Sequence, residues 1–285
     1  MTRLLLAPLR GVTIRCFRET FAPEIAAAGF TEAVTPFISA IAGVDPLADR
    51  ELRGGPAGEA LKVTPQFIGK DPDVLRRCLS RIKEAGFDTA DLNCGCPFPM
   101  VRNKGRGSGL LRHPDTLRRM LEAGCETMGP GKFSVKARLG VERSDELLSL
   151  MSIINSFPLR FLTVHGRVAR QMYDGKCDSE AVRLVVAESK VPVVLNGDIP
   201  FPPPKADNLM IGRGFLRYLG ARDDSAELLR RYIAASQAEL HGDRPLLGRM
   251  KELVAYWKDL PRWRRKWDVV KLCRSAKELI SVAAS

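Results

Sequence analysis

Short hydrophobic runs alternate with longer amphipathic segments through most of the chain. Eight of the runs end at Gly, Pro or polar residues, which is typical of buried strands. They cover residues 4–7, 30–34, 63–68, 89–93, 133–138, 161–165, 191–196 and 208–211. Between them, apolar residues at helical spacing predict helices over residues 72–85, 114–127, 145–155 and 179–189. This alternation predicts an α/β fold with a parallel sheet.

Polar side chains recur where the predicted strands end. They are Gln66, Asn93, Lys136, His165, Asn196 and Arg213. Eight strands with intervening helices favour a (β/α)₈ TIM barrel, in which the carboxyl ends of all strands open onto one face. We therefore expect these side chains to converge on a single mouth.

The connection before the last predicted strand is too short for a helix. Gly212 follows Asn196 by only 16 positions, and residues 200–207 contain four prolines. Parallel neighbours are normally joined by about a dozen or more residues that include a helix. The sequence therefore predicts a barrel that lacks its seventh helix and has an extended, proline-rich link instead.

Strand-like runs stop after about residue 221, and the remainder is helical and basic. Helices are predicted over residues 224–240, 246–257 and 268–282, with a basic run at 261–267. Residues 215–285 contain 15 Lys and Arg against 9 Asp and Glu, which is half of the net charge of +12. Because a basic surface attracts phosphates, this favours a nucleic-acid partner over a merely soluble basic protein. We expect a barrel domain, residues 1–221, and a small all-α domain, residues 222–285.

Three tryptophans in this tail are interleaved with basic residues. Trp257, Trp263 and Trp267 alternate with lysines and arginines between residues 257 and 267. In one interpretation they are buried on one face of an amphipathic helix whose basic face is solvated. In the other they contact RNA, in part by stacking. Both can hold on opposite faces.

Several classes of protein are disfavoured by composition. Seven scattered cysteines, an odd number, argue against a disulfide framework and favour a reducing cytoplasm. No apolar stretch approaches the length of a membrane span. One Cys-x-Cys and three histidines are poor evidence for a metal site. We expect a cytoplasmic monomer without metal.

The last two predicted strands each end in a glycine-containing segment. Residues 194–199 read Val-Leu-Asn-Gly-Asp-Ile, and residues 210–214 read Met-Ile-Gly-Arg-Gly. Glycines there let backbone N–H groups approach a phosphate, and Arg213 adds positive charge. No Gly-x-Gly-x-x-Gly follows an early strand, so a Rossmann nucleotide site has no support.

The segment with the most distinctive residues ends the fourth predicted strand. It reads Leu-Asn-Cys-Gly-Cys-Pro over residues 92–97, followed by Asn-Lys-Gly-Arg-Gly-Ser-Gly-Leu-Leu over residues 103–111. It resembles the active-site loop of the tRNA-dihydrouridine synthases, Leu/Ile-Asn-x-Gly-Cys-Pro. Residues 7–13 resemble the family's Ala-Pro-Met-x-Gly-Val-Thr, with Leu9 in place of Met. Residues 165–175 resemble its His-Gly-Arg-Thr segment, with Val168 in place of Thr.

This resemblance implies an FMN enzyme that reduces a D-loop uridine of tRNA, with NADPH as reductant. Cys96 would be the general acid, since a thiol of ordinary pKa is mostly protonated at neutral pH. FMN would be bound by Pro8, Leu9, Arg10, Gln66, Lys136, His165, Asn196, Gly197, Asp198, Gly212 and Arg213. The nucleotide would be bound by Asn93, Arg138, Asn103, Lys104 and Arg106. The 222–285 region would bind tRNA.

Two other functions remain open from the sequence. One is a flavin barrel reductase that acts on a free pyrimidine, which the basic tail disfavours. The other is an RNA-binding barrel protein without catalytic activity. The shortened connection before the last strand is the reason to retain this alternative. The tail and the insert at residues 37–52 favour the subfamily that modifies position 16 of tRNA.

Overall fold

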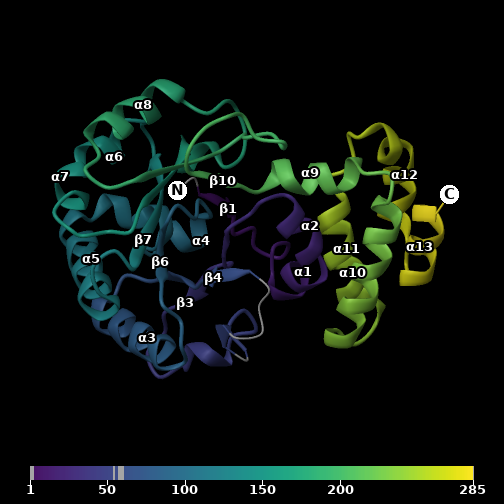
Figure 1. Cartoon of the computed structure of the whole chain (residues 1–285), viewed down its shortest axis with the longest axis horizontal. Coiled ribbons are helices and arrows are strands. Elements are labelled where there is room, and N and C mark those ends of the chain that lie inside the picture. Colours follow the sequence, from purple (N-terminus) through teal and green to yellow (C-terminus); the bar gives the residue numbers. More distant parts are fainter. Residues whose placement is uncertain (1–2, 54, 57–60, 285) are drawn as a thin grey trace.

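The computed structural model describes residues 3–53, 55–56 and 61–284. Within them, ten β-strand segments form one parallel sheet in the order β3-β5-β6-β7-β8-β9-β10-β1-β2-β4 (Figure 1). The segments are β1 (Leu4–Leu6), β2 (Glu32–Val34), β3 (Ile38–Ser39), β4 (Lys62–Thr64), β5 (Gln66–Ile68), β6 (Ala90–Cys94), β7 (Phe133–Gly140), β8 (Leu162–Val168), β9 (Val193–Asn196) and β10 (Leu209–Ile211).

The order begins with β3 and β5 and ends with β2 and β4. Because β3 continues β2 along the chain and β5 continues β4, the first and last pairs of the order are two halves of the same two strands. Only Pro65 separates β4 from β5, and only residues 35–37 separate β2 from β3. β2 pairs with β4, and β3 pairs with β5. At the interruption, the N–H of Thr35 donates to the Thr64 carbonyl, and its Oγ1 accepts from the N–H of Gln66, both at 3.0 Å. The described sheet therefore closes into a barrel of eight strand positions, which confirms the predicted TIM barrel.

Helices cover the outside of the barrel, with α3, α5, α6, α7 and α8 along its outer side in Figure 1. The helices up to residue 221 are α1 (Arg15–Thr20), α2 (Ala22–Ala27), α3 (Pro72–Glu84), α4 (Pro99–Arg102), α5 (Pro114–Met128), α6 (Glu146–Ser149), α7 (Met151–Ile154), α8 (Ser179–Glu188) and α9 (Arg213–Ala221). The predicted helix over 145–155 is instead the pair α6 and α7, divided at Leu150. Residues 197–208, all described, contain no helix, so the missing seventh helix is confirmed.

The C-terminal region consists of α10 (Ser225–Glu239), α11 (Asp243–Val254), α12 (Pro261–Leu272) and α13 (Ala276–Ala284). The predicted final helix over 268–282 is wrong, because the chain breaks at residues 273–275 and forms two helices. The basic run at 261–267 is part of α12. Pro261 takes the first helical position, where proline costs no hydrogen bond.

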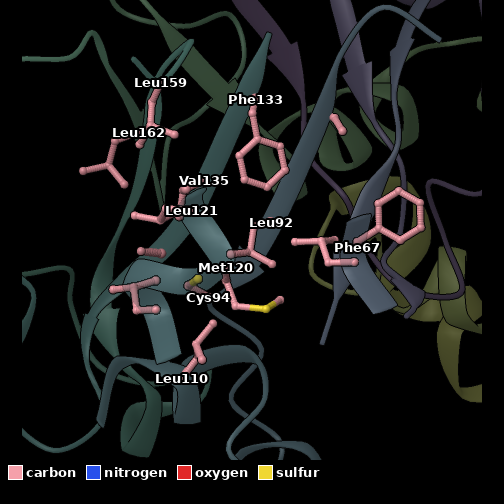
Figure 2. Close-up of a cluster of buried hydrophobic side chains, with 14 of the residues drawn as sticks. Phe67, Leu92, Cys94, Leu110, Met120, Leu121, Phe133, Val135, Leu159 and Leu162 are labelled. Carbon is pink, nitrogen blue, oxygen red and sulfur yellow. The ribbon is translucent and has the colours of Figure 1, made fainter. Parts of the chain in front are cut away.

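The hydrophobic core has two main parts. One lies between the sheet and helices α3 and α5, where Leu92, Met120 and Phe133 are fully buried (Figure 2). The other joins β1, α1 and α9 to all four C-terminal helices, through side chains such as Phe17 and Tyr232. The barrel and the C-terminal helices therefore share a core. The division at residue 221 stays a prediction.

The tryptophans of the tail belong mainly to this shared core. Trp257 and Trp263 are fully buried, and their indole N–H groups donate to the carbonyls of Leu216 at 2.7 Å and Gly220 at 3.0 Å in α9. Neither is available to stack on a base, whereas Trp267 is half-buried. Arg264 and Arg265 are among the exposed basic residues of α12. Contact between this exposed face of α12 and an RNA backbone therefore stays a prediction.

No helix in the described part of the chain is both long and apolar enough to cross a bilayer.

We predict that Gly220→Ala destabilises the protein. A Cβ at this position would lie 2.3 Å from Cδ1 of the buried Trp257 ring, and such overpacking costs about 1–3 kcal/mol. Urea denaturation measures the loss. Gly248→Ala is the matched control, because nothing lies within 4 Å of a Cβ at this exposed helical position. It should be neutral or slightly stabilising. Equal stability of the two variants would contradict the tight seating of Trp257 against α9.

Candidate active site

A cavity opens at the carboxyl ends of the barrel strands. Most of the predicted site residues line it: Pro8, Leu9, Arg10, Gln66, Asn93, Cys96, Lys136, Arg138, His165, Asn196, Gly197, Gly212 and Arg213. Ala7, Pro36, Phe37, Gly95, Pro97, Phe98 and Tyr173 complete the lining. Asp198, Asn103, Lys104 and Arg106 are not part of it. The strand-end residues thus converge as expected, and their roles stay predictions.

Cys96 lies in a turn that Asn93 closes. The Oδ1 of Asn93 accepts the backbone N–H of Gly95 at 3.0 Å and that of Cys96 at 2.8 Å. β6 ends at Cys94, so these N–H groups have left the strand ladder and the asparagine oxygen satisfies them. Cys96 is only 6% exposed. Burial raises the pKa of its thiol above the ordinary 9.0, although Arg10 and Arg138 act in the opposite direction. The group is therefore a protonated thiol at neutral pH.

The following loop supports Cys96 from behind. Both the N–H and the Oγ of Ser108 donate to the Cys96 carbonyl, at 3.1 and 2.8 Å. Gly107 has φ +58°, and a Cβ there would lie 2.8 Å from the Cys96 Cβ, so the loop packs directly against the cysteine. Asn103 and Lys104 are exposed outside the cavity. Their predicted contact with a nucleotide stays a prediction.

A chain of side-chain hydrogen bonds forms the floor of the cavity. The Nδ2 of Asn93 donates to Oε1 of Gln66 at 2.7 Å, and Nε2 of Gln66 donates to the Asp91 carboxylate at 2.8 Å. The oxygens of both amides are thus used within the protein. Each nitrogen retains one N–H, so what the two amides have left to offer is hydrogen-bond donors.

A half-buried lysine and a buried arginine lie beside this floor. Lys136 donates to Oδ1 of Asn196 at 2.9 Å, and burial lowers its pKa to about 8. Arg138 donates to the carbonyls of Gly95 and Val168, both at 3.0 Å, and burial lowers its pKa to about 10. Because these partners are neutral oxygens, the cavity wall has an electropositive character that favours electron-rich ligands.

His165 lies in the same wall as a neutral imidazole. It is 7% exposed, and burial, together with the nearby charges of Lys136 and Arg138, lowers its pKa far below its usual range. Its Nδ1 is buried without a hydrogen-bond partner in the described structure. Such groups are rare in proteins, and because His165 lines the cavity, this nitrogen is a candidate contact for a ligand.

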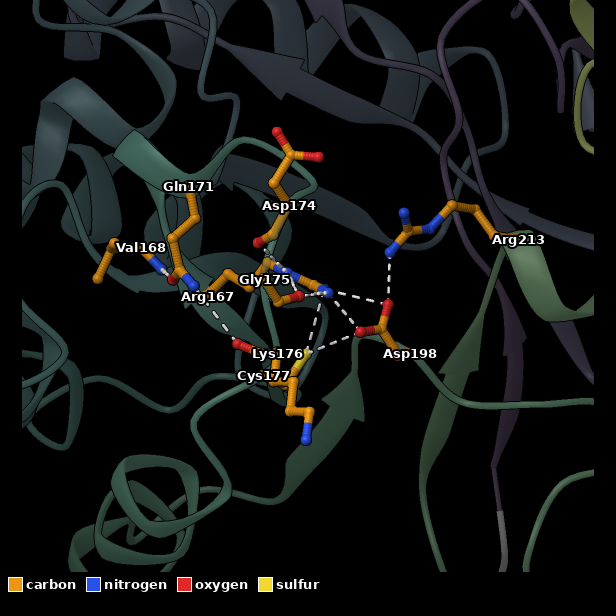
Figure 3. A network of polar contacts seen from close by, with 9 residues as sticks. All are labelled: Arg167, Val168, Gln171, Asp174, Gly175, Lys176, Cys177, Asp198 and Arg213. Carbon is orange, nitrogen blue, oxygen red and sulfur yellow. Dashed lines mark hydrogen bonds and ion pairs between the residues drawn. The ribbon is translucent and has the colours of Figure 1, made fainter.

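The glycines of the last two strand ends lie at one side of the cavity, next to Arg213. Behind them, Asp198 is held between two guanidinium groups (Figure 3). Arg213 donates to it at 2.5 Å, and the buried Arg167 binds it through both terminal nitrogens. The predicted cofactor residue Asp198 thus contacts arginines rather than lining the cavity. Its carboxylate restrains the Arg213 side chain.

No group of three or more His, Cys, Asp or Glu side chains suited to a metal ion occurs in the described ranges.

The sequence model of the family described as dihydrouridine synthase (Dus) matches residues 5–218. The chain belongs to this family. Among similar relatives, the tRNA-dihydrouridine synthase B of Vibrio cholerae is 31% identical over 219 residues, which cover 74% of this chain and 66% of the relative. The chain thus spans slightly less than two thirds of that relative's length. The Klebsiella pneumoniae tRNA-dihydrouridine synthase B is 30% identical over 263 residues, or 84% and 80% of the two chains.

Solved structures with a similar fold are more distant in sequence. An old yellow enzyme homologue from Zymomonas mobilis has a TM-score of 0.51 at 15% identity, covering 85% of this chain and 90% of that one. A mutant of morphinone reductase in complex with tetrahydroNAD has a TM-score of 0.53 at 12% identity, covering 82% and 87%. These likenesses support the barrel fold.

Sequence reasoning missed two residues that organise the site of this dihydrouridine synthase family member. Asp91 and Arg167 stand two residues from Asn93 and His165, so alternation along a strand places each on the same face as its neighbour. This two-residue spacing is the feature of the sequence that could have identified Asp91 and Arg167. Tyr173 lies at the mouth, with the guanidinium carbons of Arg138 and Arg213 at 5.4 and 5.5 Å from its ring centre.

We predict that Cys96 resists alkylation at neutral pH. Its thiol is buried with a raised pKa, whereas Cys177 is partly exposed, and only the thiolate is reactive. With limiting iodoacetamide, peptide mass spectrometry should detect modified Cys177 well before modified Cys96, and labelling of Cys96 should require pH above about 9. Equal rates at neutral pH would show that Cys96 is already a thiolate.

Proposed function

We propose that this chain is a flavin-dependent tRNA-dihydrouridine synthase, which reduces a uridine of tRNA to 5,6-dihydrouridine. The observation that carries the proposal is that the cysteine Cys96 and the half-buried lysine Lys136 line the same cavity. Family membership and the relatives named tRNA-dihydrouridine synthase B support it.

The residues of the cavity fit FMN. Gln66 and Asn93 present N–H donors, and Lys136 adds positive charge, which suits the carbonyl-rich edge of a flavin ring. The unpartnered Nδ1 of His165 offers a further contact. Gly197 and Gly212 leave backbone accessible beside Arg213, as a phosphate requires. Pro8, Leu9 and Arg10 would lie against the ring.

When bound, a reduced flavin supplies the hydride that adds to C6 of the uracil ring. Cys96 then gives its proton to C5, so that hydride and proton together saturate the C5–C6 bond. Its raised pKa keeps the proton on sulfur until it is needed. Arg10 and Arg138 stabilise the thiolate that remains, since their charges lower the pKa of this group. Solvent restores the proton before the next turnover.

Lys136 would stabilise the negative charge of a reduced flavin. NADPH is the proposed reductant. Asn93 and Arg138 line the cavity where the uracil ring would enter, and Arg102, Asn103, Lys104 and Arg106 lie on the adjoining loop.

The tRNA partner is supported by charge. A stacked base cannot reach the bottom of a cavity, so the uridine must leave the helix stack. Residues 222–285 would hold the RNA backbone through the exposed basic side chains of α12, such as Arg264 and Arg265. Residues 1–221 would form the catalytic part.

Conversion of an unmodified tRNA transcript tests the proposal. With FMN and NADPH, nucleosides from digested tRNA should show a uridine-derived species heavier by two hydrogen atoms. Cys96→Ala should lower the rate by about 100-fold or more, the usual contribution of a general acid. Cys94→Ala is the matched control, because Cys94 lies in the core and does not line the cavity.

An unchanged rate in Cys96→Ala would remove the assigned acid. Reduction of free uridine or orotate with no change in tRNA would favour a pyrimidine reductase instead.

We predict that Lys136→Met weakens FMN binding to the flavin-free protein. Loss of a charged hydrogen bond costs about 1.5–3 kcal/mol, or roughly 10- to 150-fold in affinity. In the wild type, affinity should fall as pH rises through about 8, where Lys136 loses its proton, and the variant should lack this dependence. Quenching of flavin fluorescence measures both. Lys132→Met, which removes an exposed charge near the start of β7, should bind FMN normally. Normal binding by Lys136→Met would contradict the assignment.

A further inference from the structure

Asp91 is a fully buried carboxylate that the proposed chemistry does not use. It lies on β6, two residues before Asn93, and is 0% exposed. It accepts hydrogen bonds from Nε2 of Gln66 at 2.8 Å and from Oγ of Ser134 at 2.6 Å. Strands β5, β6 and β7 thus each contribute one side chain to this contact.

The ionised carboxylate determines the direction of every hydrogen bond that follows it. A carboxylate only accepts, so Gln66 must turn its nitrogen toward Asp91 and its oxygen toward Asn93. Asn93 must then donate its nitrogen to Gln66, which leaves its oxygen for the turn. That oxygen receives the N–H groups of Gly95 and Cys96.

The opposite direction would disrupt the turn. If Gln66 presented its nitrogen to Asn93, the asparagine amide would reverse and aim its own N–H groups at two backbone N–H donors. Those donors would then lack acceptors inside the protein, a situation that buried backbone groups avoid. The turn that carries Cys96 is therefore stable in only one direction of the chain of amides.

We propose that Asp91 is a positioning residue, which fixes the direction of the Gln66 and Asn93 amides and thereby holds the Cys96 thiol in place. The catalytic meaning of this inference rests on the proposed function. The placement of the Cys96 thiol by Asp91 is independent of the proposed function.

The identity of the side chain supports this role. Burial makes the ionised form of Asp91 costly and raises its pKa to about 6. Hydrogen bonds from Ser134 and Gln66 and the charge of Lys136 oppose this rise. Asparagine would avoid that cost and has the same shape. It would also allow both directions of the amide chain, because an amide both donates and accepts.

Two substitutions of Asp91 test the proposal. Asp91→Leu removes the acceptor, and Asp91→Asn keeps the shape but permits both directions. The matched control is Glu32→Gln, which neutralises another buried carboxylate in the barrel. Glu32 binds Arg160 and Thr64 and lies outside the amide chain.

The first measurement is the rate of Cys96 alkylation in flavin-free protein, with Cys177 in the same sample as internal reference. We expect Cys96 to react faster in Asp91→Leu, to a smaller degree in Asp91→Asn, and at the wild-type rate in Glu32→Gln. The Cys177 rate should stay constant. This measurement needs neither flavin nor tRNA, so it decides the proposal even if the protein makes no dihydrouridine.

The second measurement is the steady-state kinetics of tRNA reduction. Asp91→Leu should lower kcat by about 10- to 100-fold and Asp91→Asn by a few fold, both with KM for tRNA nearly unchanged, since the acid is displaced rather than the RNA. If Asp91→Leu fails to fold, the asparagine variant decides. Wild-type Cys96 alkylation and wild-type kcat in Asp91→Asn would overturn the proposal, and so would equal effects in Glu32→Gln.

Discussion

The amide of Asn93 is the contact on which the site depends. Its oxygen accepts the N–H groups of Gly95 and Cys96, and its nitrogen donates to Gln66. One side chain thus closes the turn at the end of β6 and ties that turn to β5. Without it, the N–H groups of Gly95 and Cys96, which follow the end of β6 at Cys94, would lack a hydrogen-bond acceptor. The Cys96 thiol is held by the barrel itself rather than by a free loop.

Around this contact the barrel buries positive charge next to neutral oxygens. Lys136 is bonded to the Asn196 amide and Arg138 to two backbone carbonyls, while His165 stays neutral. Burial of these cations is unfavourable by itself, as the lowered pKa values of Lys136 and Arg138 show. A ligand rich in oxygen acceptors would offset part of that cost. Cys96 stays in the thiol form although Arg10 and Arg138 favour its ionisation, because burial opposes that ionisation more strongly.

Much of the fold was predictable, because a hydrophobic strand that ends in a polar residue leaves a local signal. All eight strand positions and the missing helix before β10 follow from such signals. The break at residues 273–275 does not, since no proline or glycine marks it. Convergence of the strand ends on one cavity was also predictable. The position of Asp198 behind the cavity was not, because its pairing with Arg167 and Arg213 depends on contacts between different strands.

Every catalytic role proposed for this cavity depends on its holding a flavin beside Cys96. The most direct test is the visible absorption spectrum of the freshly purified protein, followed by titration of flavin-free protein with FMN. We expect flavin absorption bands, or uptake of one FMN per chain with quenched fluorescence. A colourless protein that binds no FMN would contradict it and would favour an RNA-binding barrel without redox chemistry.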